Sequence, residues 1–184
     1  KLSSFKKIYG RIFKEENKMV TLGFIGEGIE PFIASVFWPV FIYLNLKNYQ
    51  AVGFVISFSL FLSLITLLVL KKYLDKREEK FFKFGLLGNI ANWVSRAFAT
   101  ASGAIIFLDV VYNLLSLFVW TPFGSIFYKK AKNDRVFDFV VKREVIIHFA
   151  RLLSTVLIAV IWFYTQSMFL IFLLAVIGLM LSER

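Results

Sequence analysis

The sequence predicts an all-α polytopic membrane protein with six transmembrane helices. Hydrophobic residues make up 59% of its 184 positions, and the mean hydropathy of +0.73 is far above that of a soluble domain of this size. The charged residues are gathered in short segments between long apolar runs, as in integral membrane proteins. Because Lys and Arg cluster beside apolar runs and not along a soluble basic face, the net charge of +10 does not indicate nucleic-acid binding.

About 20 helical residues cross a hydrocarbon core about 30 Å thick, and six segments approach that length. The predicted spans are 20–44, 51–71, 81–99, 102–127, 143–164 and 167–182. The third and fourth spans meet at Thr100–Gly103, and the fifth and sixth meet at Tyr164–Ser167, so each pair is expected to form a helical hairpin. Residues 1–19 are then a cytoplasmic lead-in, and residues 20–184 are one transmembrane domain.

The distribution of Lys and Arg predicts the orientation, because these residues are retained in cytoplasmic loops. Three clusters of six cations, together with Arg184, hold 19 of the 22. The clusters are Lys1, Lys6, Lys7, Arg11, Lys14 and Lys18; Lys71, Lys72, Lys76, Arg77, Lys80 and Lys83; and Lys129, Lys130, Lys132, Arg135, Lys142 and Arg143. Only Lys47 lies in an opposite connection, while Arg96 and Arg151 lie inside spans. We therefore expect both ends in the cytoplasm and the spans in the inner membrane. Since the chain begins with Lys1 and no signal peptide, we also expect it to be part of a longer protein.

Two short amphipathic segments flank spans on the cytoplasmic side. Residues 133–141 alternate charged and apolar side chains at helical spacing, and residues 5–12 do the same before the first span. Each is expected to be either an interfacial helix or an ordinary linker.

Ionisable residues inside spans are costly and normally face a bundle interior or a wet cavity. In the first span, Glu27 and Glu30 lie three residues apart and share one helix face. Two nearby carboxylates can together hold a proton or a cation, which makes this pair the sharpest functional candidate. The alternative is a structural role or contact with lipid headgroups.

The third span places Asn89, Asn92 and Arg96 on one face. We expect the two asparagines to form hydrogen bonds between helices more readily than to bind substrate. Arg96 lies shortly before the turn to the fourth span and Asp109 shortly after it. In an antiparallel hairpin these two side chains reach similar depth and are expected to neutralise each other.

The fourth span has a continuous polar stripe of Asp109, Asn113, Ser116 and Trp120. Such a stripe is typical of a helix that borders an aqueous path, although tryptophans in spans more often serve packing. The sixth span has no polar residue between Met168 and Leu181 and is expected to face lipid at least in part.

The fifth span has Glu144, His148, Arg151 and Thr155 on one face. We expect a conformation-dependent ion-pair cluster of Glu144, His148 and Arg151 rather than a binding site. His148 is the only histidine, and an imidazole can relay protons near neutral pH, which is a second and weaker hypothesis.

Enzymatic motifs are missing from the sequence. It has no nucleophile elbow, no H-E-x-x-H and no Gly-rich phosphate loop, and one histidine with no cysteine cannot build a conventional metal centre. We expect no enzyme, no cofactor and no metal site, and a membrane-embedded lipid-modifying enzyme remains only a third hypothesis.

The connection after the second span resembles the cytoplasmic loop motif of the major facilitator superfamily, G-x-x-x-D-R-x-G-R-K. Asp75 matches the family aspartate, Lys76 the basic residue after it, and Lys80 the final base. Departures from the motif occur at Lys71, Glu78 and Glu79. Six spans, two cytoplasmic ends and a Gly-rich first span containing Glu30–Pro31 add to the resemblance.

The resemblance covers the whole chain as the carboxy-terminal half of a twelve-helix transporter. It implies that this half packs against a similar amino-terminal half or a second copy, and that a small solute crosses between them. It places Glu27, Glu30, Asp109, Asn113 and Trp120 along the substrate or proton pathway, because the first and fourth helices of each half line the cavity. It makes Asp75 a conformational latch on the cytoplasmic side that meets either helix ends or the residues around Arg143 and Glu144.

These observations predict a secondary active transporter domain that moves a small solute by alternating access, with possible proton coupling through Glu27, Glu30 or Asp109. The alternative is a self-contained six-helix protein in the lipid bilayer, either a homodimeric half-size transporter or a scaffold for a membrane partner.

Overall fold

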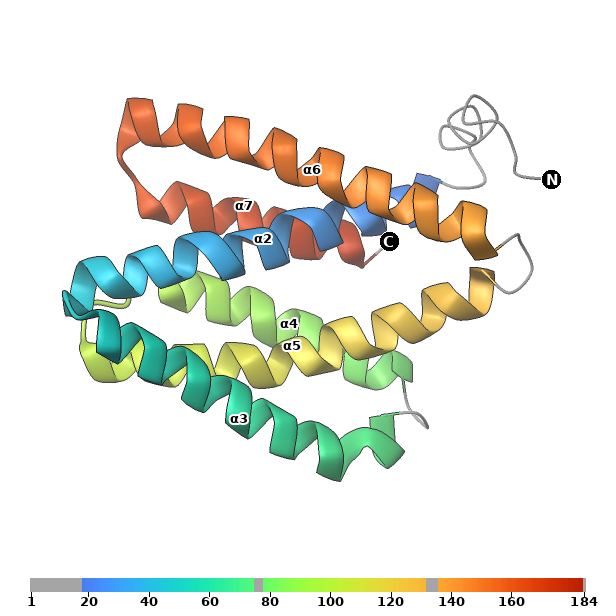
Figure 1. The fold of residues 1–184 in the computed structure, drawn as a ribbon, viewed down its shortest axis with the longest axis horizontal. Helices are drawn as coiled ribbons and strands as arrows, with labels where there is room; N and C mark the ends of the chain where they lie inside the picture. The colour runs from blue at the N-terminus through green and yellow to red at the C-terminus, as the bar shows by residue number, and fades with distance from the viewer. Residues whose placement is uncertain (1–17, 75–77, 132–135, 184) are drawn as a thin grey trace.

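The computed structural model describes residues 18–74, 78–131 and 136–183, and these residues form six α-helices and no strand. The helices are α2 (Lys18–Leu46), α3 (Tyr49–Leu74), α4 (Glu78–Arg96), α5 (Ser102–Ala131), α6 (Val136–Thr165) and α7 (Met168–Ser182). Each overlaps one predicted span, so the all-α class is confirmed. Consecutive helices run antiparallel in one bundle (Figure 1).

Four of the described helices, α2, α3, α5 and α6, are long and apolar enough to cross a membrane. The other two are shorter or more polar. α4 has 19 residues and begins with charged side chains, while α7 has 15 residues and a length of roughly 22 Å at 1.5 Å per residue. α3 and α6 expose large apolar side chains such as Phe61, Leu68, Leu152 and Phe163. Such a continuous apolar exterior is typical of a membrane protein.

The predicted helical hairpins are confirmed. Turns at residues 47–48, 97–101 and 166–167 connect α2 to α3, α4 to α5 and α6 to α7 at one end of the bundle. The start of α2, the starts of α4 and α6, and the ends of α3 and α5 lie at the opposite end (Figure 1). The sequence clusters of Lys and Arg adjoin that second end, which we call the basic end.

The segment 133–141 does not form a separate interfacial helix over its described part. From Val136 onward it is the first two turns of α6, and Phe139 packs edge-on against Phe24 of α2 with ring centroids 5.6 Å apart. Phe139 therefore serves packing between helices, whereas Phe137 is exposed. The remaining residues 133–135 and the segment 5–12 lie outside the described residues.

The chain can be divided into two successive units of three helices, α2–α4 and α5–α7, and most of the helix packing lies between the units. α2 packs mainly against α7 and α6, while α5 packs mainly against α4 and α3. The two units make equivalent contacts when α2 is matched with α5, α3 with α6 and α4 with α7. The contact of α2 with α7 then corresponds to that of α5 with α4, and the contact of α2 with α6 corresponds to that of α5 with α3. The contact between α4 and α7 joins two matched helices, so it is unchanged by this exchange. Because each unit has three antiparallel helices, the second unit runs in the opposite direction to the first.

Glycines allow the closest approaches between the two units. A Cβ atom at Gly26 in α2 would overlap the backbone oxygen of Gly178 and the hydroxyl of Ser182 in α7. A Cβ atom at Gly85 in α4 would lie 2.7 Å from Cβ of Phe118 in α5. The predicted lipid-facing α7 thus has one face buried against α2, while Ile177 is among its exposed apolar residues.

Candidate functional site: a buried charge cluster

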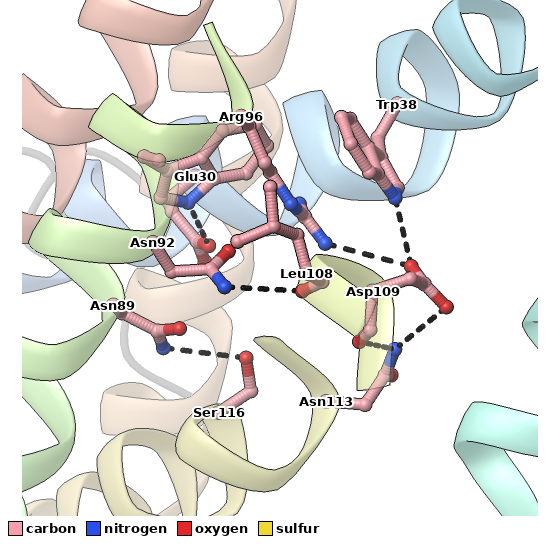
Figure 2. Close-up of polar contacts among 10 residues, drawn as sticks. Glu30, Trp38, Asn89, Asn92, Arg96, Leu108, Asp109, Asn113 and Ser116 are labelled. Carbon is pink, nitrogen blue, oxygen red and sulfur yellow. Dashed lines mark hydrogen bonds and ion pairs between the residues drawn. The ribbon is translucent and has the colours of Figure 1, made fainter. Parts of the chain in front are cut away.

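Three charged side chains lie in the centre of the bundle, and we call them the charge cluster: Glu30 of α2, Arg96 of α4 and Asp109 of α5 (Figure 2). Glu30 and Arg96 are 0% exposed, and Asp109 is 3% exposed. Because burying an ionised group in a membrane-spanning bundle is costly, the partners of each charge decide what the cluster can do.

Asp109 has partners on both carboxylate oxygens. Trp38 Nε1 donates to Oδ1 over 2.7 Å, and Arg96 Nη2 lies 3.5 Å from the same oxygen. Asn113 Nδ2 donates to Oδ2 over 3.4 Å and to the backbone oxygen of Asp109 over 2.9 Å. The predicted pairing of Arg96 with Asp109 is confirmed, and it joins the first unit of the bundle to the second.

Arg96 is surrounded by aromatic rings. Its guanidinium carbon lies 3.9 Å from the ring centroid of Trp38, 4.1 Å from that of Tyr112 and 4.6 Å from that of Trp93. All three distances are within the range of a cation–π interaction. Its Nε and Nη1 atoms have no hydrogen-bond partner among the described residues. The ring faces and one long ion pair therefore hold this charge.

Glu30 is bonded through one oxygen only. Trp93 Nε1 donates to Oε1 over 2.9 Å, whereas Oε2 is buried and has no hydrogen-bond partner in the described part of the chain. Tyr112 and Trp120 of α5 also lie near this carboxylate, but Trp120 Nε1 is outside hydrogen-bond geometry. Glu30 is thus the charge of the cluster with an unfilled bonding position.

The two asparagines of α4 bond to α5, as predicted. Asn89 Nδ2 donates to Oγ of Ser116 over 3.3 Å, and Asn92 Nδ2 donates to the backbone oxygen of Leu108 over 3.0 Å. The Oδ1 atoms of both asparagines are buried without a hydrogen-bond partner among the described residues. Figure 2 shows both amides pointing from α4 toward α5.

Glu27 and Glu30 have different partners, so they do not form the expected carboxylate pair. The carboxylate of Glu27 pairs with Arg143 of α6, whose Nε donates to Oε2 over 3.0 Å and whose Nη2 bonds the other oxygen. Arg143 Nη1 also donates to Glu144 Oε1 over 2.9 Å. α6 supplies the partner of Glu27, whereas α4 supplies the partner of Glu30. Glu27 therefore belongs to an ion-pair link between α2 and α6.

The cluster predicted along α6 forms only in part. His148 Nε2 lies 3.7 Å from Glu144 Oε2, and its side chain is 66% exposed. Arg151 has no ion pair within the described residues, and its Nε is buried without a hydrogen-bond partner. Lys80 is exposed in the first turn of α4. Asp75 and Lys76 lie outside the described residues, so the predicted latch is not described.

Two aromatic residues of the site were not singled out from the sequence, Trp93 and Tyr112. A signal for both exists, because Trp93 precedes Arg96 by three residues and Tyr112 follows Asp109 by three. Each therefore shares a helix face with a charged residue.

Comparisons of this chain with protein-family models, with curated proteins and with solved structures give no match. Among the described residues, no group of three or more His, Cys, Asp or Glu side chains is placed to hold a metal ion.

Proposed function

We propose that the chain is a domain of a secondary active transporter, one six-helix half of a major-facilitator-type bundle. The observation that supports this function best is that the helices of α2–α4 and the matching helices of α5–α7 make equivalent contacts in the bundle. Inverted three-helix repeats of this kind occur within each half of such transporters. In this proposal all six helices cross the inner membrane, the basic end faces the cytoplasm, and a small solute moves by alternating access.

The position of the charge cluster also supports transport. Arg96 in the first unit pairs with Asp109 in the second, and Trp38 in the first unit donates to the same carboxylate. Binding sites in secondary transporters lie near the bilayer midplane where repeats meet. We assign Glu30, Asp109, Asn113 and Trp120 to the pathway of solute or protons.

The outer parts of the bundle suggest the partners. The exposed apolar faces of α3 and α6 contact membrane lipid or a second six-helix bundle, which is an amino-terminal half or another copy of this chain. The ion pair of Glu27 with Arg143 fixes α2 against α6 at the basic end. Asp75 remains a proposed latch at that end.

Solute binding tests this function. We expect at least one member of a panel of small cationic, neutral and anionic solutes to raise the thermal stability of the purified full-length protein. Saturation at 100 times Kd corresponds to about 2.7 kcal/mol of stabilisation. Glu30→Gln should remove this shift, while Glu79→Gln, the same substitution at an exposed position of α4, should keep it. A stable six-helix oligomer that no solute stabilises would instead favour a scaffold.

A further inference from the structure

The charge cluster has more negative than positive side chains. Glu30 and Asp109 each bring one carboxylate, and Arg96 brings the one guanidinium within the cluster. Fully ionised, the cluster therefore has one net negative charge. An uncompensated charge in this environment is strongly unfavourable, so the cluster is expected to take up one positive charge.

The hydrogen bonds distinguish the three carboxylates that sequence reasoning left as candidates for proton coupling. Glu27 is paired with Arg143 at the basic end, and both oxygens of Asp109 have partners. Glu30 alone of these three has a buried oxygen with no partner among the described residues. A proton needs no cavity, so it can occupy this closed position.

Within the described residues, no other ionisable group near Glu30 supplies the missing charge. α4 presents Arg96, which Asp109 shares, and α5 presents Tyr112. α7 has no titratable side chain within Met168–Ser182, and α6 faces α2 next to Glu30 through Ile147 and Ala150, both in contact with Gly28. α3 has its titratable residues only in its end turns.

We infer that Glu30 is the proton-carrying residue of this chain, binding one proton at Oε2 in each transport cycle. The inference rests on the proposed transport function and names its coupling ion. Oε2 takes the proton from water on one side of the membrane and returns it on the other, while the bond from Trp93 to Oε1 is kept. Arg96 and Asp109 set the charge balance around Glu30.

Infrared difference spectroscopy of the full-length protein in lipid vesicles tests the inference. Acidification from about pH 9 to about pH 6, a range in which exposed carboxylates remain ionised, should produce the C=O band of one protonated carboxyl group per chain, with the shift to lower frequency that D2O causes. Glu30→Gln should remove this band. Glu27→Gln, the same change three residues earlier on the same helix, should leave it. Absence of the band from the folded wild-type protein throughout this range, or its persistence in Glu30→Gln, would overturn the inference.

Asp109→Asn provides a second variant that does not alter Glu30. With Asp109 neutral, Arg96 balances Glu30, so the protonated band should appear only at lower pH or be lost. An unchanged band in folded Asp109→Asn would contradict the charge argument.

The proton assignment and the transport function can fail separately. If the protein transports solute but shows no such band, the proton assignment is wrong and the proposed function stands. If the band is present but the protein neither binds nor transports any solute, the proposed function is wrong and the proton site stands.

Discussion

Arg96→Met is expected to cause the largest loss of stability of any single substitution in the charge cluster. The variant leaves the Asp109 carboxylate buried with no cation beside it, and ionisation of Glu30 would add a second uncompensated negative charge. It also removes the group on which Trp38, Trp93 and Tyr112 pack. Removing one partner of a buried ion pair typically lowers the free energy of unfolding by about 3–5 kcal/mol. Unfolding in mixed micelles with increasing SDS, followed by tryptophan fluorescence, measures this change.

A matched control is available in α6. Arg151 is also an arginine inside a span, but it has no ion pair among the described residues. Arg151→Met should therefore cost much less than Arg96→Met. Adding Asp109→Asn to Arg96→Met should restore part of the stability, because it removes the buried carboxylate that has lost its cation. Equal losses for the two arginine variants would contradict the role assigned to Arg96.

Gly26→Ala is expected to separate α2 from α7. The new methyl group would overlap the backbone oxygen of Gly178, which cannot turn away as a side chain can, and would lie 3.0 Å from the backbone nitrogen of Ser182. Overpacking a tight contact costs about 1–3 kcal/mol, and we expect a loss at or above the upper end of this range. The same SDS titration measures it.

Gly53→Ala is the control for this substitution. A Cβ atom at Gly53 in α3 meets no atom within 4 Å. Gly53→Ala therefore changes only the intrinsic helix propensity, which favours Ala over Gly by about 1 kcal/mol. If Gly26→Ala were as stable as Gly53→Ala, the close approach of α2 and α7 would be refuted.

The sequence predicted the six helices of the described residues and their order because long apolar runs and clustered cations are local signals. Their ends were less predictable. α6 begins at Val136 and not at residue 143, because its first turns lie beyond the apolar run and are stabilised by packing such as that of Phe139 on Phe24. Helical extensions of this kind have no hydropathy signal.

The sequence predicted which helix faces hold the residues of the candidate site, but not which side chains those residues contact. The spacing of Asn92 and Arg96 along α4 correctly indicated contact with α5, since a hairpin limits the possible neighbours. Glu27 and Glu30 lie on one helix, and their periodicity gave no sign that one would meet Arg143 and the other Trp93. Partners separated by 116 and 63 positions depend on the order of helices around the bundle, which periodicity does not specify.

Two-sided access to the polar stripe of α5 would show directly whether this domain transports by alternating access. The chain has no cysteine, so Ser116→Cys introduces a single, nearly isosteric thiol between Asn113 and Trp120. A membrane-impermeant thiol reagent would be applied to vesicles of each orientation, with Val160→Cys on the exposed apolar face of α6 as the control. We predict labelling of Ser116→Cys from both sides and of Val160→Cys from neither. Labelling of Ser116→Cys from one side only, or from neither, would contradict alternating access.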